Sequence, residues 1–269
     1  MIFSALGFTL LNSFVKYLQH YSAFQLVFFR SAGSLFFTMG FLIKHKIPML
    51  GNQKKLLITR GLVGVTSMLF FFMALKYLPI GSAVSMRYIG PIFAAIFALF
   101  ILKEQIKSIQ WLCFGIAFSG VVILKGFDTE ISTIGLIYIL ISALFSGMVY
   151  VLLRKIGEKD HPVVVVNYFM VIATLVGGIL SIGKWVQPTG YEWLMLGSLG
   201  LFGYIGQLNM TKAFQYAEAN MVAPMKYIEV IFTMLIGVLW FDDNYTVYSI
   251  FGILLIIIGL VMNVMVKRK

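Results

Sequence analysis

Apolar residues run through the chain in ten long blocks, which short clusters of charged and turn residues separate. Each block approaches the roughly 20 apolar residues that a helix needs to cross a bilayer. The blocks lack the polar/apolar alternation of barrel strands, and in lipid a spanning helix satisfies its own backbone hydrogen bonds. The pattern therefore predicts an all-α integral membrane protein. Its ten transmembrane helices should cover roughly residues 1–18, 23–43, 56–75, 81–102, 108–125, 133–153, 162–182, 191–212, 219–241 and 246–266.

The composition of the 269-residue chain agrees with this class. Hydrophobic residues make up 60% and charged residues 12%, and the mean hydropathy is +0.95. Soluble domains hold about 25% charged residues, so a soluble enzyme and a disordered protein are excluded, and ten helices leave no room for a soluble domain. The single cysteine, Cys113, excludes an intrachain disulfide, and the three histidines lie far apart. We therefore expect neither a metal nor a cofactor.

The distribution of basic residues predicts the orientation. The net charge is +11, with 21 Lys and Arg residues. With ten helices, fourteen of these residues, Arg60 among them, fall on connections that share a side with the N-terminus, and four fall on the opposite side. Cytoplasmic loops are rich in Lys and Arg, so both termini should be cytoplasmic. The excess of positive charge thus fits cytoplasmic connections rather than nucleic-acid binding. The short connections and the missing targeting region suit a multi-pass cell (inner) membrane protein.

The two halves of the chain are related by a weak internal repeat. Met86–Ile89 corresponds to Met225–Ile228 at an offset of 139 positions, which becomes 138 near the start, where Lys16 corresponds to Arg154. The repeat predicts two five-helix domains. Because five is odd, the two copies would enter the membrane in opposite orientations, a design typical of transporters. The predicted repeats cover residues 1–125 and 133–266.

Several motifs resemble those of the EamA-type family in the drug/metabolite transporter superfamily. They are Phe28–Ser31, Ala74–Pro79, Tyr88–Pro91 and Leu102–Gln105, and the resemblance covers nearly the whole chain. The second half departs from the family pattern at Asp242–Asn244, where a Gly-Glu step is common. The first block also starts without a cytoplasmic tail, which points to a shortened N-terminus. The resemblance implies secondary transport of small metabolites without indicating which metabolite.

Charged residues inside the predicted helices are the first candidates for chemistry, because a charge in hydrocarbon costs at least about 2.5–3.5 kcal/mol. Arg30 either reaches the headgroups or faces a cavity. Arg87 has no acidic partner on its own helix and is the main candidate to bind a substrate carboxylate or phosphate. Lys226 and Glu229 lie three residues apart, so they share a helix face. This pair either fixes packing or lines a pathway in which Glu229 couples transport to protons. With Glu229 protonated, Lys226 would share the substrate-binding role of Arg87.

Polar, aromatic and proline residues complete the predicted site. Pro91 and Pro224 should distort the fourth and ninth helices, and such breaks are tolerated where they line a cavity. The further substrate-binding candidates are Tyr88, Tyr227, Asn12 and Gln207. The fifth and tenth helices carry no charge in their cores, so we expect them to face lipid or a second copy of the chain.

The excess of cations over acids within the helices favours an anionic or zwitterionic substrate, such as an amino acid or a nucleoside-like metabolite. We therefore expect a secondary transporter of a small organic metabolite that works by alternating access within the lipid bilayer. A passive facilitator or channel is the alternative within transport. A membrane-embedded lipid-modifying enzyme is the alternative outside it. Such an enzyme would need a nucleophile, a metal cluster or a paired acid and base, and the sequence shows no His/Asp cluster at either membrane face.

Overall fold

The computed structural model describes all residues except 102, 104–106, 128–130, 217–226 and 269. The described chain is helical, with no strand. Each of the ten predicted blocks contains a helix. In order, the α-helices are α1 (Ile2–Tyr17), α2 (Ala23–Lys44), α3 (Lys54–Leu75), α4 (Ile80–Arg87), α5 (Gly90–Ile101), α6 (Ser108–Phe127), α7 (Thr133–Ile156), α8 (Pro162–Ser181), α9 (Glu192–Tyr216), α11 (Ile228–Phe241) and α12 (Val247–Arg268).

Seven helical stretches among the described residues are long and apolar enough to cross a membrane. They are α2, α3, the joined α4 and α5, α6, α7, α8 and α12. Helix α1 has 16 residues and the described α11 has 14, so both fall short of the 18 residues required of a membrane-spanning helix in this count. Helix α9 has 25 residues but many glycines and polar side chains. The chain is therefore a multi-pass membrane protein.

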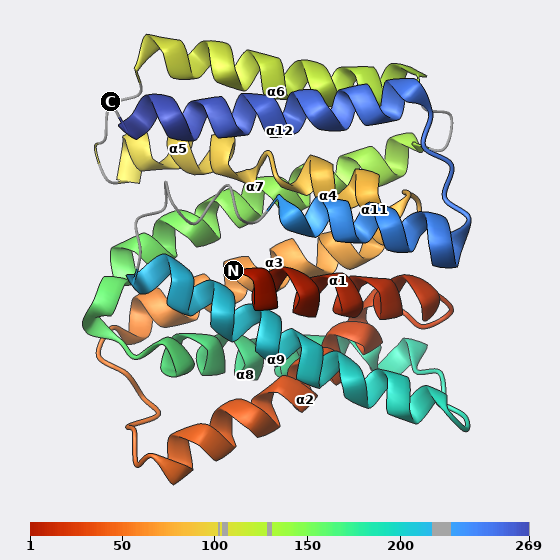
Figure 1. Cartoon of the computed structure of the whole chain (residues 1–269). Coiled ribbons are helices and arrows are strands. Elements are labelled where there is room, and N and C mark those ends of the chain that lie inside the picture. Colours follow the sequence, from red (N-terminus) through yellow and green to blue (C-terminus); the bar gives the residue numbers. More distant parts are fainter. Residues whose placement is uncertain (102, 104–106, 128–130, 217–226, 269) are drawn as a thin grey trace.

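The helices lie roughly side by side, with α12 ending at the left-hand end of the bundle in Figure 1 and α1 beginning nearer its middle. Helix α2 packs along α8, α3 along α7, and α1 along α9. Helices α6 and α12 pack along each other at the edge farthest from α2. There Gln110 donates a 2.9 Å hydrogen bond to Asn263. The side-chain contacts between helices include many apolar residues, while outward-facing apolar side chains remain exposed, as a lipid-facing surface requires.

The fourth predicted helix is divided into two shorter helices. Helix α4 ends at Arg87, Tyr88 and Ile89 follow, and α5 begins at Gly90. Pro91 is the second residue of α5 and cannot donate a backbone hydrogen bond, so a continuous ladder through this point is not available. Helix α4 packs against α11, whereas α5 packs along α7. Helix α4 also contacts α7, so the two halves of this span share α7 but differ in their main neighbour.

Glycines allow α2 and α9 to approach closely. A β-carbon on Gly200 would lie 2.5 Å from the Cα of Gly33, and one on Gly33 would lie 2.7 Å from the Cα of Gly200. In contrast, a β-carbon on Gly197, one turn earlier in α9, would meet nothing within 4 Å. Small residues permit such close packing of membrane helices, and Gly200 is required at this crossing in a way that Gly197 is not.

A polar network joins the ends of α1 and α11 to the start of α4. Lys16 Nζ forms a 2.7 Å ion pair with Asp243 Oδ1. The other carboxylate oxygen of Asp243 accepts hydrogen bonds from the backbone N–H of Ile80 (3.0 Å) and from the Tyr245 hydroxyl (3.3 Å). The Tyr245 hydroxyl in turn accepts from the N–H of Gly81 at 3.0 Å. A single carboxylate thus holds three helices together at one end of the bundle.

Candidate functional site

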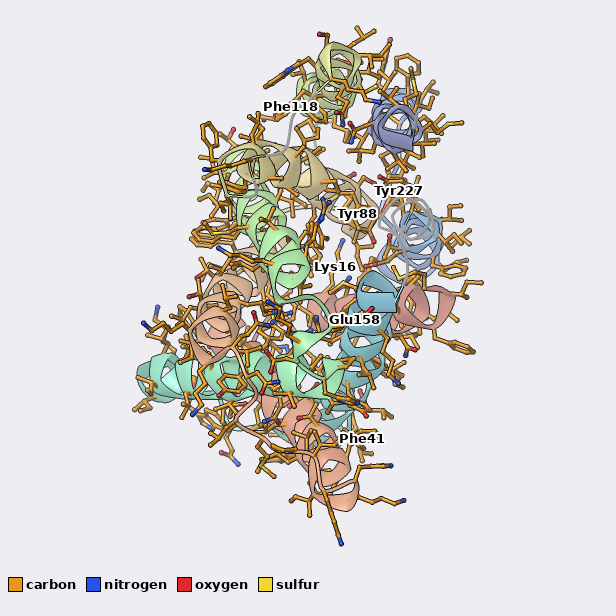
Figure 2. The ribbon with its side chains drawn as sticks, turned by 90° about the vertical axis from the view of Figure 1, so that its left-hand side faces the viewer. Lys16, Phe41, Tyr88, Phe118, Glu158 and Tyr227 are labelled. Atoms are coloured by element: carbon orange, nitrogen blue, oxygen red, sulfur yellow. The ribbon has the colours of Figure 1, made fainter. Side chains whose placement is uncertain are left out.

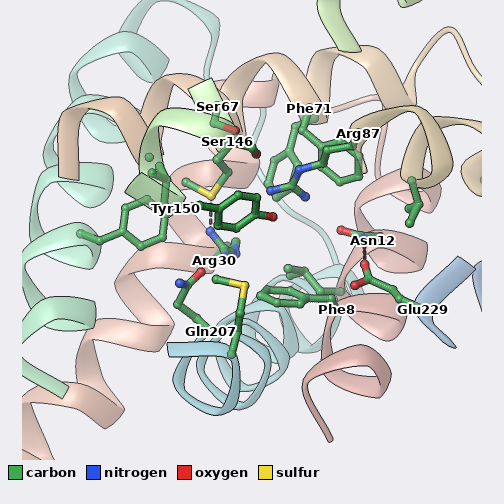
Figure 3. Close-up of a pocket in the computed structure, with 18 of the residues that line it drawn as sticks. Phe8, Asn12, Arg30, Ser67, Phe71, Arg87, Ser146, Tyr150, Gln207 and Glu229 are labelled. Carbon is green, nitrogen blue, oxygen red and sulfur yellow. Dashed lines mark hydrogen bonds between the residues drawn. The ribbon is translucent and has the colours of Figure 1, made fainter. Parts of the chain in front are cut away.

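A cavity lies within the bundle, between helices of both halves of the chain (Figure 3). Its empty volume is about 720 Å³, including the part open to solvent. Aromatic and polar side chains dominate the wall. The lining residues are Phe8, Leu11, Asn12, Arg30, Arg60, Gly64, Ser67, Met68, Phe71, Phe72, Val84, Arg87, Tyr88, Ser146, Val149, Tyr150, Phe169, Gln207, Met210 and Glu229.

Three arginines reach this cavity from three helices, and each guanidinium lies over an aromatic ring. Arg60 Cζ is 4.3 Å from the ring centre of Phe169, and Arg30 Cζ is 5.6 Å from the same centre. Arg87 Cζ is 4.2 Å from the ring centre of Phe71. Arg30 and Arg60 are only 3% and 2% exposed. The rings attract the cations and fix the positions of the three guanidiniums.

Two of these arginines keep hydrogen-bond donors without a partner among the described residues. The unpaired atoms are Nε of Arg30, Nε and Nη1 of Arg60, and Nε2 of Gln207. Arg30 Nη1 contacts the thioether sulfur of Met68, which is a weak acceptor. Buried polar groups are nearly always paired, and leaving one unpaired costs about 1–3 kcal/mol. The cavity therefore presents donors that are available to an acceptor on a bound molecule.

Two glycines make room for the arginine side chains. A β-carbon on Gly64 would lie 3.2 Å from Arg60 Nη1, and one on Gly203 would lie 3.1 Å from Arg30 Nε. Gly64 and Gly203 are 139 positions apart, so they occupy the same position of the two repeats. Each makes room for one arginine, and both arginines come from the first half. These glycines serve the cavity as well as helix packing.

A single carboxylate lines the cavity among the described residues, and it comes from α11. Glu229 is 5% exposed. Its Oε1 accepts a 3.2 Å hydrogen bond from Asn12 on α1, and its Oε2 accepts a 2.5 Å bond from the hydroxyl of Tyr88. The Tyr88 ring meets the Tyr227 ring edge to face, with the ring centres 5.6 Å apart, and Figure 2 shows the two side chains next to each other.

The structure brings together six of the residues singled out in the sequence. Asn12, Arg30, Arg87, Tyr88, Gln207 and Glu229 all line the same cavity. Arg30 therefore faces the interior rather than the headgroups. Tyr227 is buried behind Tyr88 and does not line the cavity. Lys226 and Pro224 lie outside the described residues. Among the described residues, no group of three His, Cys, Asp or Glu side chains is placed to bind a metal.

One cavity residue was misassigned from the sequence. Arg60 was counted among the charges of a cytoplasmic connection, but it lies in the interior of α3 and is buried. Its spacing held a usable signal: Arg60, Gly64, Ser67 and Phe71 follow one another at intervals of three or four residues and share one face of the helix. That face lines the cavity.

The comparisons with known proteins agree with a membrane transporter. The EamA-like transporter family matches residues 1–125 and 133–265, so the chain belongs to this family, within the drug/metabolite transporter superfamily. A solved crystal structure with 18% sequence identity superposes with a TM-score of 0.70 and covers 98% of each chain, which shows the shared fold.

Relatives with assigned names are transporters. The pseudopaline exporter CntI of Pseudomonas aeruginosa is 28% identical over 96% of this chain and 92% of its own length. Human solute carrier family 35 member G1 is 28% identical over 95% of this chain and 75% of its own. The S-adenosylmethionine uptake transporter of Rickettsia prowazekii is 23% identical over 92% and 84%. Family and relatives thus point to a transporter of small metabolites rather than to an enzyme.

Proposed function

We propose that this protein is a secondary transporter that moves a small organic anion or zwitterion across a cell membrane by alternating access. The observation that carries the proposal is the cavity wall. It holds three guanidiniums and one carboxylate among its described residues, and several buried donors there have no partner within the described chain. Such a wall favours a bound anion. The aromatic side chains around it would enclose the rest of a metabolite-sized solute.

Equivalent contacts in the two halves support an inverted-repeat architecture. Ser4 Oγ donates to the carbonyl of Gly206 at 2.9 Å, and Ser142 Oγ donates to the carbonyl of Ser67 at 2.8 Å. Ser4 and Ser142 are 138 positions apart, and Ser67 and Gly206 are 139 apart, which are the offsets of the sequence repeat. The same hydrogen bond is therefore made twice, with the two halves exchanging roles.

The α6–α12 pair shows the same exchange. A β-carbon on Gly120 would lie 2.5 Å from the carbonyl oxygen of Gly252, and one on Gly259 would lie 2.7 Å from the carbonyl oxygen of Cys113. Gly120 and Gly259 are 139 positions apart, as are Cys113 and Gly252. Contacts of this kind are expected of two repeats around a shared axis in the membrane plane.

This architecture has ten spans and places both termini on one side of the membrane. The excess of Lys and Arg on the connections of that side favours the cytoplasm. The short connections between the spans suit a bacterial-type inner membrane, to which we assign the protein. Helices α6 and α12, at the edge of the bundle, would meet lipid or a second copy of the chain.

Reconstitution into proteoliposomes tests the function. Vesicles preloaded with one member of a metabolite panel, containing anions, zwitterions, cations and neutral solutes, are assayed for counterflow of the same labelled solute. We expect exchange of at least one anion or zwitterion above protein-free vesicles. Exchange restricted to cations or neutral solutes, or no exchange by protein that elutes as a single folded species, would contradict the proposal.

A further inference from the structure

The polar groups of the cavity are divided between separate positions on its wall. We define the arginine pole as Arg30, Arg60 and Gln207, which come from α2, α3 and α9. Figure 3 places Arg30 and Gln207 on one side of the cavity, and Glu229 with Asn12 on the other. Arg87 reaches the cavity from α4 over the ring of Phe71. The guanidiniums thus rest on two different rings, with Arg30 and Arg60 over Phe169 and Arg87 over Phe71.

Four nitrogens of the arginine pole have no acceptor among the described residues. These nitrogens belong to Arg30, Arg60 and Gln207, and the one described contact of the Arg30 terminal nitrogens is with the sulfur of Met68. The carboxylate of Glu229 is held on the other side by Asn12 and Tyr88. Two guanidiniums over one ring repel each other, and this repulsion is strong where water is scarce. An anion between them would remove the repulsion and fill the donors.

A carboxylate or phosphate group fits this pole by geometry. A guanidinium presents its donors as a planar fork that binds two oxygens at once, and the amide of Gln207 adds a further donor. One such group would fill the unpaired donors of the arginine pole, and Arg87, over the other ring, offers a second fork. Both rings, Phe169 against Arg30 and Arg60 and Phe71 against Arg87, also line the cavity.

On these grounds, and resting on the proposed transport function, we infer that the substrate carries two separate anionic groups. One group is bound by Arg30, Arg60 and Gln207, and the other by Arg87. The charges agree with this assignment: with Glu229 ionised, the three described guanidiniums keep an excess of two positive charges, which a dianion balances. A monoanion would leave one of the two cationic positions uncompensated in the interior.

Thermal unfolding of the purified full-length protein in detergent tests the inference. The probes are the α,ω-dicarboxylates from malonate to adipate, the monomethyl ester of each, and monocarboxylates of equal length, all at matched ionic strength. We expect one range of dicarboxylate lengths to raise the unfolding midpoint. Its apparent affinity should exceed that of the matched ester at least roughly tenfold, since the ester loses one charge-assisted contact. Equal midpoints for diacid and ester at every length would overturn the inference.

Two variants separate binding from structure. Arg60→Met keeps a long side chain over Phe169 but removes the fork, and Arg154→Gln removes an exposed arginine at the end of α7 as the matched control. In Arg60→Met the preference for diacid over ester should disappear without a lower midpoint in the absence of probe, because a buried charge with two unpaired nitrogens has gone. Arg154→Gln should keep the preference. A retained preference in Arg60→Met, with a lowered probe-free midpoint, would show that Arg60 only supports the fold.

Counterflow in proteoliposomes distinguishes failure of this inference from failure of the transport function. If a monoanion or a zwitterion without a second acidic group is exchanged and no dicarboxylate competes with it, the dianionic substrate is wrong while transport stands. If dicarboxylates stabilise the protein through Arg60 but no solute crosses the bilayer, the binding assignment stands and the transport function is wrong.

Discussion

Tyr88 and Tyr227 occupy the same position in the two halves of the chain, and their rings meet edge to face with centres 5.6 Å apart. Tyr88 lies between α4 and α5, and Tyr227 immediately precedes α11. The hydroxyl of Tyr88 also donates to Glu229. The contact therefore places a helix interruption of the first half directly against the start of a helix in the second, beside the carboxylate of the cavity.

The Tyr88 hydroxyl should matter more than that of its repeat mate. Tyr88→Phe keeps the ring contact but removes a donor to the buried Glu229, so it should lower the free energy of unfolding by about 1–3 kcal/mol. Tyr227→Phe is the matched control, because the described residues give the Tyr227 hydroxyl no hydrogen bond. Thermal unfolding in detergent measures both. Equal losses in the two variants would show that the hydrogen bond to Glu229 contributes little.

Arg87 should be essential for transport and dispensable for folding. Arg87→Ala removes the guanidinium over Phe71, and counterflow of an anionic substrate should fall at least about tenfold, since a hydrogen bond to a charged group contributes about 1.5–3 kcal/mol. Membrane insertion and the gel-filtration profile should remain those of the wild type. Normal counterflow by Arg87→Ala would assign this arginine to packing.

Glu229 should set the coupling of transport to protons. Glu229→Gln keeps the shape of the side chain and an oxygen that accepts from Asn12, but the amide cannot take up or release a proton during transport. The variant should still exchange substrate across the membrane, while accumulation driven by an imposed proton gradient should be lost. Parallel measurements of counterflow and gradient-driven uptake check this. Wild-type accumulation in Glu229→Gln would leave the carboxylate a structural role only.

The Lys16–Asp243 pair should stabilise the end of the bundle. Asp243→Asn leaves the Lys16 ammonium without its counter-charge and weakens the contacts to Ile80 and Tyr245, so we expect a loss of roughly 1–3 kcal/mol in the free energy of unfolding. Asp242→Asn is a close control, because Asp242 is exposed and has φ of 52°, a left-handed conformation that asparagine tolerates.

The double variant Lys16→Met/Asp243→Asn tests whether the two charges of this pair interact in the folded protein. Removing both charges should recover part of the stability lost in Asp243→Asn, because the uncompensated ammonium has gone. Additive losses in the double variant would show that the two charges do not interact in the folded protein.

Gly200 and Gly197 should respond in opposite ways to the same substitution. Gly200→Ala forces a methyl group against the backbone of Gly33 and should cost about 1–3 kcal/mol. Gly197→Ala adds a methyl group in open space and should be neutral or stabilising by up to about 1 kcal/mol, since alanine favours the helix. Unfolding midpoints of the two variants decide the matter, and equal midpoints would contradict the close approach of α2 and α9.

Hydropathy predicts where the helices of this protein lie along the chain, but it does not predict which helices pack together. The predicted block 23–43 corresponds to α2, and block 133–153 to the first part of α7, because a run of apolar residues in a membrane protein must form a helix. Block 81–102 was predicted as a distorted helix, and Pro91 marks the place where α5 begins. The pattern does not specify which face of one helix meets another.

The cavity could be predicted only in part for the same reason. Arg30, Arg87 and Glu229 could be singled out as candidates because a charge inside the membrane costs free energy, which a function or a partner must offset. The partners themselves are remote: Asn12 is 217 positions from Glu229, and Tyr88 is 141 positions from it. The sequence does not reveal the burial of Arg60, because the ring that its guanidinium contacts, that of Phe169, comes from another helix.

The interruption at Tyr88 and Ile89 divides the fourth span into two arms that have different main neighbours in the bundle. The α4 arm is tied to α11 and, through the carboxylate of Asp243, to the end of α1. The α5 arm follows α7. A torque between these two groups of helices would concentrate at the joint, whose side chain Tyr88 lines the cavity. A solute bound against Tyr88 would therefore touch the joint between the two arms.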